Sequence, residues 1–192
     1  MTERELAGEL GKNLDGSFEW LVRVYQDRLY SFARRLTNHA QDAEEVVQEA
    51  FVRAYQALKT YPSERIETMD LKPWLYRILL NVFRNRVRRG RPQTVSLEKM
   101  NADGGIPRVN EGPIDPESLV GDSEIRNHLE KALSSLPEKY RVPVILRYVE
   151  GIEYSKMREI LKQPEGTIKA NVHRGIRMLK EKWSQRNKEK EG

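Results

Sequence analysis

The sequence predicts an all-α protein made of two small helical domains joined by a flexible acidic linker. Apolar residues recur at the three-and-four spacing of helix faces along most of the 192 residues, and no segment shows the alternation of a half-buried strand. Residues 92–121 break this pattern, because they are rich in proline, glycine and acidic side chains. A structureless segment of that length is unusual inside a compact domain, so we interpret it as a linker between domains.

The first domain is predicted to span residues 17–91, after an N-terminal extension at 1–16. Its first helix runs over residues 17–36, where apolar residues form one face. A second helix begins after Asn38, a suitable cap with Gln41 three residues on, and ends near Leu58. A loop over residues 59–72 leads to a third helix, and Pro73 is suited to its first turn.

The third helix, "WLYRILLNVFRNRVRRGRP", has two different faces. Its apolar side chains share one side and are expected to be buried: Leu75, Ile78, Leu79, Val82 and Phe83. Arginine and asparagine recur on the other side, at Arg77, Asn81, Arg84, Asn85 and Arg88. Arginine makes bidentate contacts to phosphates and base edges, and asparagine both donates and accepts hydrogen bonds. Because solvated helix faces usually mix acidic with basic residues, we interpret this carboxylate-free stripe as a nucleic-acid-binding surface.

Aromatic side chains accompany the stripe, with Tyr61 in the preceding loop and Trp74 at the start of the helix. Aromatic rings beside arginines hold single-stranded bases by stacking, which contributes roughly 1–3 kcal/mol per base. The alternative for Trp74 is that it belongs to the hydrophobic core.

The second helix has an acidic and amide-bearing outer surface at its amino end, comprising Asp42, Glu44, Glu45, Gln48 and Glu49. One explanation is local, because carboxylates at a helix start stabilise the helix dipole. The other is a docking surface for a basic protein, since an acidic helix is unsuited to DNA.

The second domain, predicted at residues 122–183, has four helices, and its last two are separated by a turn of about four residues. A short helix, a tight turn and a longer basic helix form a helix-turn-helix pattern, whose second helix enters the major groove. Its candidate DNA-reading residues are Thr167, Lys169, Ala170, Asn171, His173, Arg174 and Arg177. Residues 184–192 are predicted to be a disordered tail.

Composition excludes several classes of site. The chain has no cysteine, which rules out disulfides and thiolate metal sites, and its three histidines are not at metal-ligand spacing. A net charge of +5 favours polyanionic partners only weakly. No phosphate-binding glycine loop or catalytic motif is present, so we expect no catalytic residue, metal, cofactor or small-molecule substrate. The first residues lack an apolar signal segment and no run is long enough to span a membrane, so we expect a cytoplasmic protein.

Three motifs together resemble the extracytoplasmic-function (ECF) sigma factors of bacterial RNA polymerase. They are "DAEEVVQEAFVRAYQAL", "WLYRILLNVFRNRVRR" and "LPEKYRVPVILRYVEGIEYSKMREIL…PEGTIKANVHRGIRMLKE", in the family's order and spacing. The resemblance implies that the two domains are sigma domain 2 and sigma domain 4. The first would melt and read the −10 promoter element through the loop at 59–72 and the third helix, and the second would read the −35 element.

The resemblance also implies partners. It implies that Asp42, Glu45, Gln48 and Glu49 dock on the clamp helices of the polymerase β′ subunit, that the second domain binds the β flap, and that the linker runs toward the RNA exit channel. An anti-sigma factor is a further possible partner. Some residues depart from the family pattern: Glu153 replaces a hydroxyl cap, Arg158 replaces a small residue, and Asn171 stands where arginine is common. These departures affect which −35 sequence is read.

The alternative function is a stand-alone helix-turn-helix regulator that binds duplex DNA without polymerase. Such a regulator has no need of the acidic second helix, the arginine and asparagine stripe or the aromatic loop. These features therefore favour the sigma factor.

Overall fold

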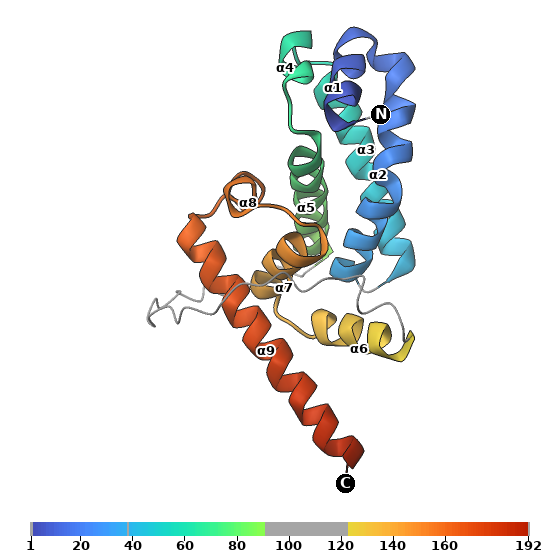
Figure 1. The fold of residues 1–192 in the computed structure, drawn as a ribbon. Coiled ribbons are helices and arrows are strands. Elements are labelled where there is room, and N and C mark those ends of the chain that lie inside the picture. Colours follow the sequence, from blue (N-terminus) through green and yellow to red (C-terminus); the bar gives the residue numbers. More distant parts are fainter. Residues whose placement is uncertain (1, 38, 91–122, 192) are drawn as a thin grey trace.

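The computed structural model describes residues 2–37, 39–90 and 123–191, and within these ranges the chain is helical with short connections and no strand (Figure 1). The prediction of an all-α fold is confirmed. The predicted linker, residues 92–121, lies outside the described residues. The first helical body comprises α1 (Glu3–Lys12), α2 (Leu14–Thr37), α3 (Ala40–Leu58), α4 (Ser63–Glu67) and α5 (Leu71–Gly90). The second comprises α6 (Ser123–Ser134), α7 (Glu138–Val144), the π-helical segment η2 (Ile145–Val149), α8 (Tyr154–Leu161) and α9 (Glu165–Glu191).

The core of the first body lies between α2, α3 and α5. α2 and α3 pack along their lengths, and both contact α5. The buried residues follow the spacing predicted from the sequence, as Leu21, Leu29 and Phe32 on α2 are fully buried, and so are Ala43 and Ala54 on α3. Burial of each such leucine or phenylalanine contributes about 1.5–3 kcal/mol of hydrophobic free energy.

Helix α1 forms where the sequence analysis placed only an N-terminal extension. Thr2 and Glu5 form a reciprocal capping box at its start, and the helix buries Leu6 and Leu10 against α2 and α4. The carboxylate of Glu3 accepts a hydrogen bond from the backbone N–H of Lys72 at 2.7 Å. α1 therefore supports the start of α5 and the segment before it.

Helix α5 is buried on two sides, whereas the sequence predicted one. Leu75, Leu79, Val82 and Phe83 are buried as predicted and Ile78 is partly buried, but Tyr76 and Leu80 are also inaccessible to solvent. Tyr76 and Leu80 are one turn apart, on a ridge of α5 that is adjacent to the predicted polar stripe. α8 of the second body packs against α5. Trp74 is only 7% exposed, so it belongs to the hydrophobic core, which was the alternative interpretation of this residue.

The second body is built around α7 and α9, which pack closely. Pro143 lies inside α7 and cannot donate a backbone hydrogen bond, and the next turn, η2, widens to a π-helix. Gly151 then ends the segment with φ +64°, a conformation that costs glycine little. α8, a short turn and α9 form the predicted helix-turn-helix.

Helix α9 continues to Glu191, so the prediction of a disordered tail at 184–192 is corrected for residues 184–191. Lysine, glutamate, glutamine and arginine dominate this segment and are all strong helix formers. Among all the helices that the structure describes, none combines the length and apolar character needed to cross a bilayer.

Candidate nucleic-acid interface

The polar stripe of α5 is accessible along much of its length. Asn81 and Arg88 are exposed, and Arg77 and Asn85 are partly buried. The Arg88 guanidinium donates a hydrogen bond to Oδ1 of Asn85 at 3.1 Å, which links two predicted DNA contacts one turn apart. The stripe therefore offers two guanidiniums and two amides along one line of the helix.

Arg84 departs from the other members of the predicted stripe. Its Nε lies 2.9 Å from Oε1 of Glu138 on α7, in the second body. In this arrangement Arg84 is already paired with a carboxylate. The sequence does not reveal this contact, because the two residues are separated by 54 positions and belong to different domains.

The segment before α5 places aromatic and basic groups together. The rings of Tyr61 and Trp74 pack edge to face with centroids 6.2 Å apart, and the Arg65 guanidinium lies 3.7 Å from the centre of the Tyr61 ring. Arg65 was not among the predicted site residues, although a cation in a loop with aromatic residues was a signal for it. Arg65, Trp74 and Arg77 line a cleft of about 400 Å³, and Lys156 and Glu159 of α8 form part of its other wall.

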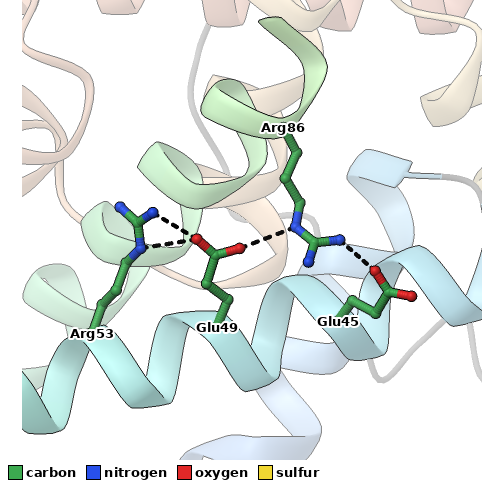
Figure 2. A network of polar contacts seen from close by, with 4 residues as sticks. All are labelled: Glu45, Glu49, Arg53 and Arg86. Carbon is green, nitrogen blue, oxygen red and sulfur yellow. Dashed lines mark hydrogen bonds and ion pairs between the residues drawn. The ribbon is translucent and has the colours of Figure 1, made fainter. Parts of the chain in front are cut away.

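The acidic surface of α3 contains an alternating network of charges, shown in Figure 2. Arg86 on α5 donates to Glu45 at 2.6 Å and to Glu49 at 3.1 Å, and Arg53 donates to the other oxygen of Glu49 at 2.6 Å. The four side chains carry two positive and two negative charges, so the network is neutral as a whole. The predicted docking residues Asp42 and Gln48 are exposed and lie outside this network.

The network shifts the protonation equilibria of Glu49 and Arg86. Partial burial acts to raise the pKa of Glu49, but hydrogen bonds and charges from Arg86 and Arg53 outweigh it and lower that pKa below its usual value. Hydrogen bonds to Glu45 and Glu49 raise the pKa of Arg86. Glu49 is therefore ionised at neutral pH. Arg86 and Arg53 were not among the predicted site residues, although the spacing of Glu49 and Arg53, one helical turn apart, was a signal for their pair.

The predicted DNA-reading residues of α9 are not equally accessible. Arg177 is exposed, and Thr167, Lys169, Ala170, His173 and Arg174 are partly buried. The Lys169 ammonium pairs with Glu165 at 2.9 Å and lies 5.4 Å from the centre of the Tyr154 ring. Together these side chains form a basic, partly exposed surface on the first turns of α9.

The prediction that Asn171 reads DNA is corrected, because only 8% of this residue is exposed to solvent. It is one turn before Gly175, where a Cβ atom would come within 2.6 Å of the Val144 side chain on α7. Asn171 therefore lies on the side of α9 that packs against α7, and it is not available to DNA in this conformation. Its polarity alone suggested an outer position.

Two family models match the chain, "Sigma-70 region 2" over residues 21–93 and "Sigma-70, region 4" over residues 126–179. The ECF RNA polymerase sigma factor SigW of Bacillus subtilis is 29% identical over 175 residues, which are 90% of this chain and 91% of the relative. The ECF RNA polymerase sigma factor SigE of Mycolicibacterium smegmatis is 34% identical over 86% of this chain and 61% of the relative. Among solved structures, the sigma factor RpoE of Bartonella quintana, in complex with the anti-sigma factor NepR, has a TM-score of 0.61 and 27% identity, and the match covers 85% of this chain and 94% of RpoE.

Proposed function

The chain belongs to the extracytoplasmic-function sigma factors of bacterial RNA polymerase, and we propose that its two helical bodies read the two elements of a promoter. It acts as an alternative sigma factor that directs core polymerase to specific promoters. One observation supports the assignment of one promoter element to each body. The chain has a carboxylate-free stripe on α5 and a basic helix-turn-helix at α8 and α9.

The first body contacts the −10 element. Arg77, Arg84 and Arg88 are proposed to bind the DNA backbone as bidentate donors. The exposed amide of Asn81 and the partly exposed amide of Asn85 are suited to base edges, which require a donor and an acceptor together. Tyr61 is proposed to stack on an unpaired base, and Trp74 holds Tyr61 in position from the core.

The second body reads the −35 element through the first turns of α9, with Lys169, Arg174 and Arg177 as donors to phosphates and base edges. Thr167, Ala170 and His173 form the surrounding surface. The same body is proposed to bind the β flap of polymerase.

Docking on the clamp helices of the β′ subunit is proposed to use Asp42, Glu45, Gln48 and Glu49 of α3. Glu45 and Glu49 are held in fixed positions by Arg86, so they meet a basic partner without having to be ordered first. An anti-sigma factor is a further proposed partner, because the similar RpoE structure was determined with one bound.

The chain is proposed to act without catalysing a reaction of its own, in the cytoplasm, where polymerase and the chromosome are found. Run-off transcription with core polymerase on a library of genomic promoters tests the proposal. We expect discrete start sites that depend on this protein, and loss of transcripts in Arg77→Ala and Lys169→Ala variants that remain folded. A protein that binds duplex DNA but does not co-purify with core polymerase would instead be a stand-alone regulator.

A further inference from the structure

Helix α1 packs against the loop at residues 59–72, which has a proposed role in melting and reading the −10 element. Figure 1 shows α1 beside α4 at one end of the first body, and α4 makes its main contacts with α1. α4 lies within the loop, so the start of the chain contacts a DNA-binding segment that is distant in the sequence. The match to the Sigma-70 region 2 model begins at residue 21, so α1 is an addition to the part of the domain that this model describes.

The position of α4 depends on α1. Five residues are too few to form a stable helix alone, so α4 requires a packing partner. The buried residue of α4 is Ile66, which belongs to the same core cluster as Leu6 and Leu10 of α1. The two helices approach closely at Gly11, where a Cβ atom would lie 3.0 Å from the backbone oxygen of Ser63. α1 therefore holds α4 in place.

The position of α4 in turn affects the aromatic residues of the loop. Arg65 belongs to α4, and its guanidinium lies 3.7 Å from the centre of the Tyr61 ring. The other neighbour of Tyr61 is Trp74, in the first turns of α5. The proposed base-stacking ring therefore lies between α4 and α5, and its orientation depends on both.

Glu3 joins α1 directly to α5. One oxygen of its carboxylate accepts the backbone N–H of Lys72 at 2.7 Å. The first N–H groups of a helix have no partner within the helix, and a carboxylate beside them is favourable for the helix dipole. The Tyr25 hydroxyl of α2 interacts with the same carboxylate, because burial raises the pKa of Tyr25 and the charge of Glu3 and a hydrogen bond to it raise that pKa further. Glu3 therefore fixes the first turn of α5 relative to α1 and α2.

We propose that α1 is a brace for the −10-reading loop and that Glu3 is a positioning residue for promoter melting. Glu3 does not touch DNA: it holds the first turn of α5 at one end of the loop, while the rest of α1 holds α4. The inference rests on the DNA-binding role proposed for Tyr61 and α5. A loop that already has its binding conformation binds DNA more tightly, because no free energy is lost in ordering it.

Three single substitutions test the brace. Glu3→Ala removes the acceptor of the Lys72 N–H. Gly11→Ala displaces α4 from the other end of α1, and it does so without loss of helix propensity. Glu9→Ala is the matched control, because this carboxylate is on the same helix but pairs with Lys12 of α1 itself, at 3.1 Å.

The first measurement is hydrogen exchange of the free protein, which requires no DNA-binding role. We expect backbone amides of residues 60–72 to exchange at least about fivefold faster in Glu3→Ala, the factor expected for one lost hydrogen bond. Gly11→Ala should change the same segment in the same direction, and Glu9→Ala should not change it. Exchange in α3 should stay as in the wild type in all three proteins, because α3 does not depend on the brace.

The second measurement is open-complex formation by the holoenzyme on a duplex promoter obtained from the run-off screen. We expect Glu3→Ala to reduce it by a similar factor, Gly11→Ala to reduce it as well, and Glu9→Ala to leave it unchanged. Competition for core polymerase should be unchanged in all three. A double-mutant cycle with Tyr61→Ala separates positioning from general destabilisation, since Glu3→Ala should cost less than about twofold once the Tyr61 ring is absent.

Unchanged exchange over residues 60–72 in both Glu3→Ala and Gly11→Ala would show that α1 does not hold the loop, and the proposal would be wrong. Faster exchange with normal open-complex formation would also overturn it. Equal losses of core binding and open-complex formation, or the same loss with and without the Tyr61 ring, would make α1 a general stabiliser of the first body and overturn it too. If the wild-type holoenzyme opened no promoter although exchange rose as expected, the fault would lie in the proposed DNA-binding role, while the brace itself would stand.

Discussion

Reversal of Glu45 and Glu49 to lysine is expected to weaken polymerase binding, but the structure shows that it will also destabilise the first body. The change removes the ion pairs of Arg86 with Glu45 and Glu49 and of Arg53 with Glu49, and it places four cations side by side. The side chains are 29–46% exposed, so solvent screening limits each pair to about 0.2–1 kcal/mol. We expect a loss of about 1–3 kcal/mol in the free energy of unfolding, which a typical domain with 5–15 kcal/mol survives.

A charge swap separates docking from folding. Adding Arg53→Glu and Arg86→Glu to the reversed protein restores opposite charges within the network but leaves cations where the docking carboxylates were. We expect urea unfolding to return to within about 1 kcal/mol of the wild type, because the network is neutral again.

Binding to core polymerase is measured by competition against labelled wild-type protein. We expect the swapped protein to remain a poor competitor despite its restored stability. If it competes as well as the wild type, Glu45 and Glu49 serve only to join α3 to α5, and polymerase docks elsewhere.

Three further outcomes follow from burial and titration. Leu79→Ala should lower the free energy of unfolding by about 2–5 kcal/mol in urea titrations, because Leu79 is fully buried between helices, and a loss below about 1 kcal/mol would contradict its place in the core. Gly175→Ala should cost about 1–3 kcal/mol in the same assay, since its Cβ would lie 2.6 Å from the Val144 side chain; a neutral change would mean that α7 and α9 pack less closely. Burial raises the pKa of Glu150 above 4.5, against the opposing effects of Tyr76, Lys72, Arg35 and Arg28. Because the raised pKa belongs to the folded chain, protonation of Glu150 stabilises the fold, and the free energy of unfolding of the wild type in urea should rise relative to that of Glu150→Gln as the pH falls through this pKa toward 4.5; a difference that does not change with pH would contradict the burial of Glu150.

The helix faces of α2 and α3 could be predicted because both helices pack mainly within the first body, against elements close in the sequence. Leu29 and Phe32 on α2, and Ala43 and Ala54 on α3, lie where a period of 3.6 residues places them. α1 has the same kind of pattern in Leu6, Ala7 and Leu10, but its ten residues give too few turns for the pattern to stand out.

The second buried side of α5 could not be predicted in this way. Tyr76 packs on Phe32 of α2 but donates its hydroxyl to Glu150, which lies 74 residues away in the second body, and helical periodicity carries no information about such a partner. The same reason applies to Arg84 and Glu138. Residue type suggested that Arg84 and Asn171 were exposed, but only the packing of α7 decides where these two side chains lie.

The most direct test of the account is open-complex formation by the holoenzyme on a panel of single −10 substitutions at several salt concentrations. Asn81→Ala should relax selectivity at one −10 position, with roughly 1–3 kcal/mol of discrimination lost for that base pair. Arg88→Ala is the matched change, since both side chains are exposed on α5. It should weaken binding on all sequences and lower the salt slope by about one. A uniform loss for Asn81→Ala, or no loss for either change, would place the −10 DNA on another surface and contradict the account.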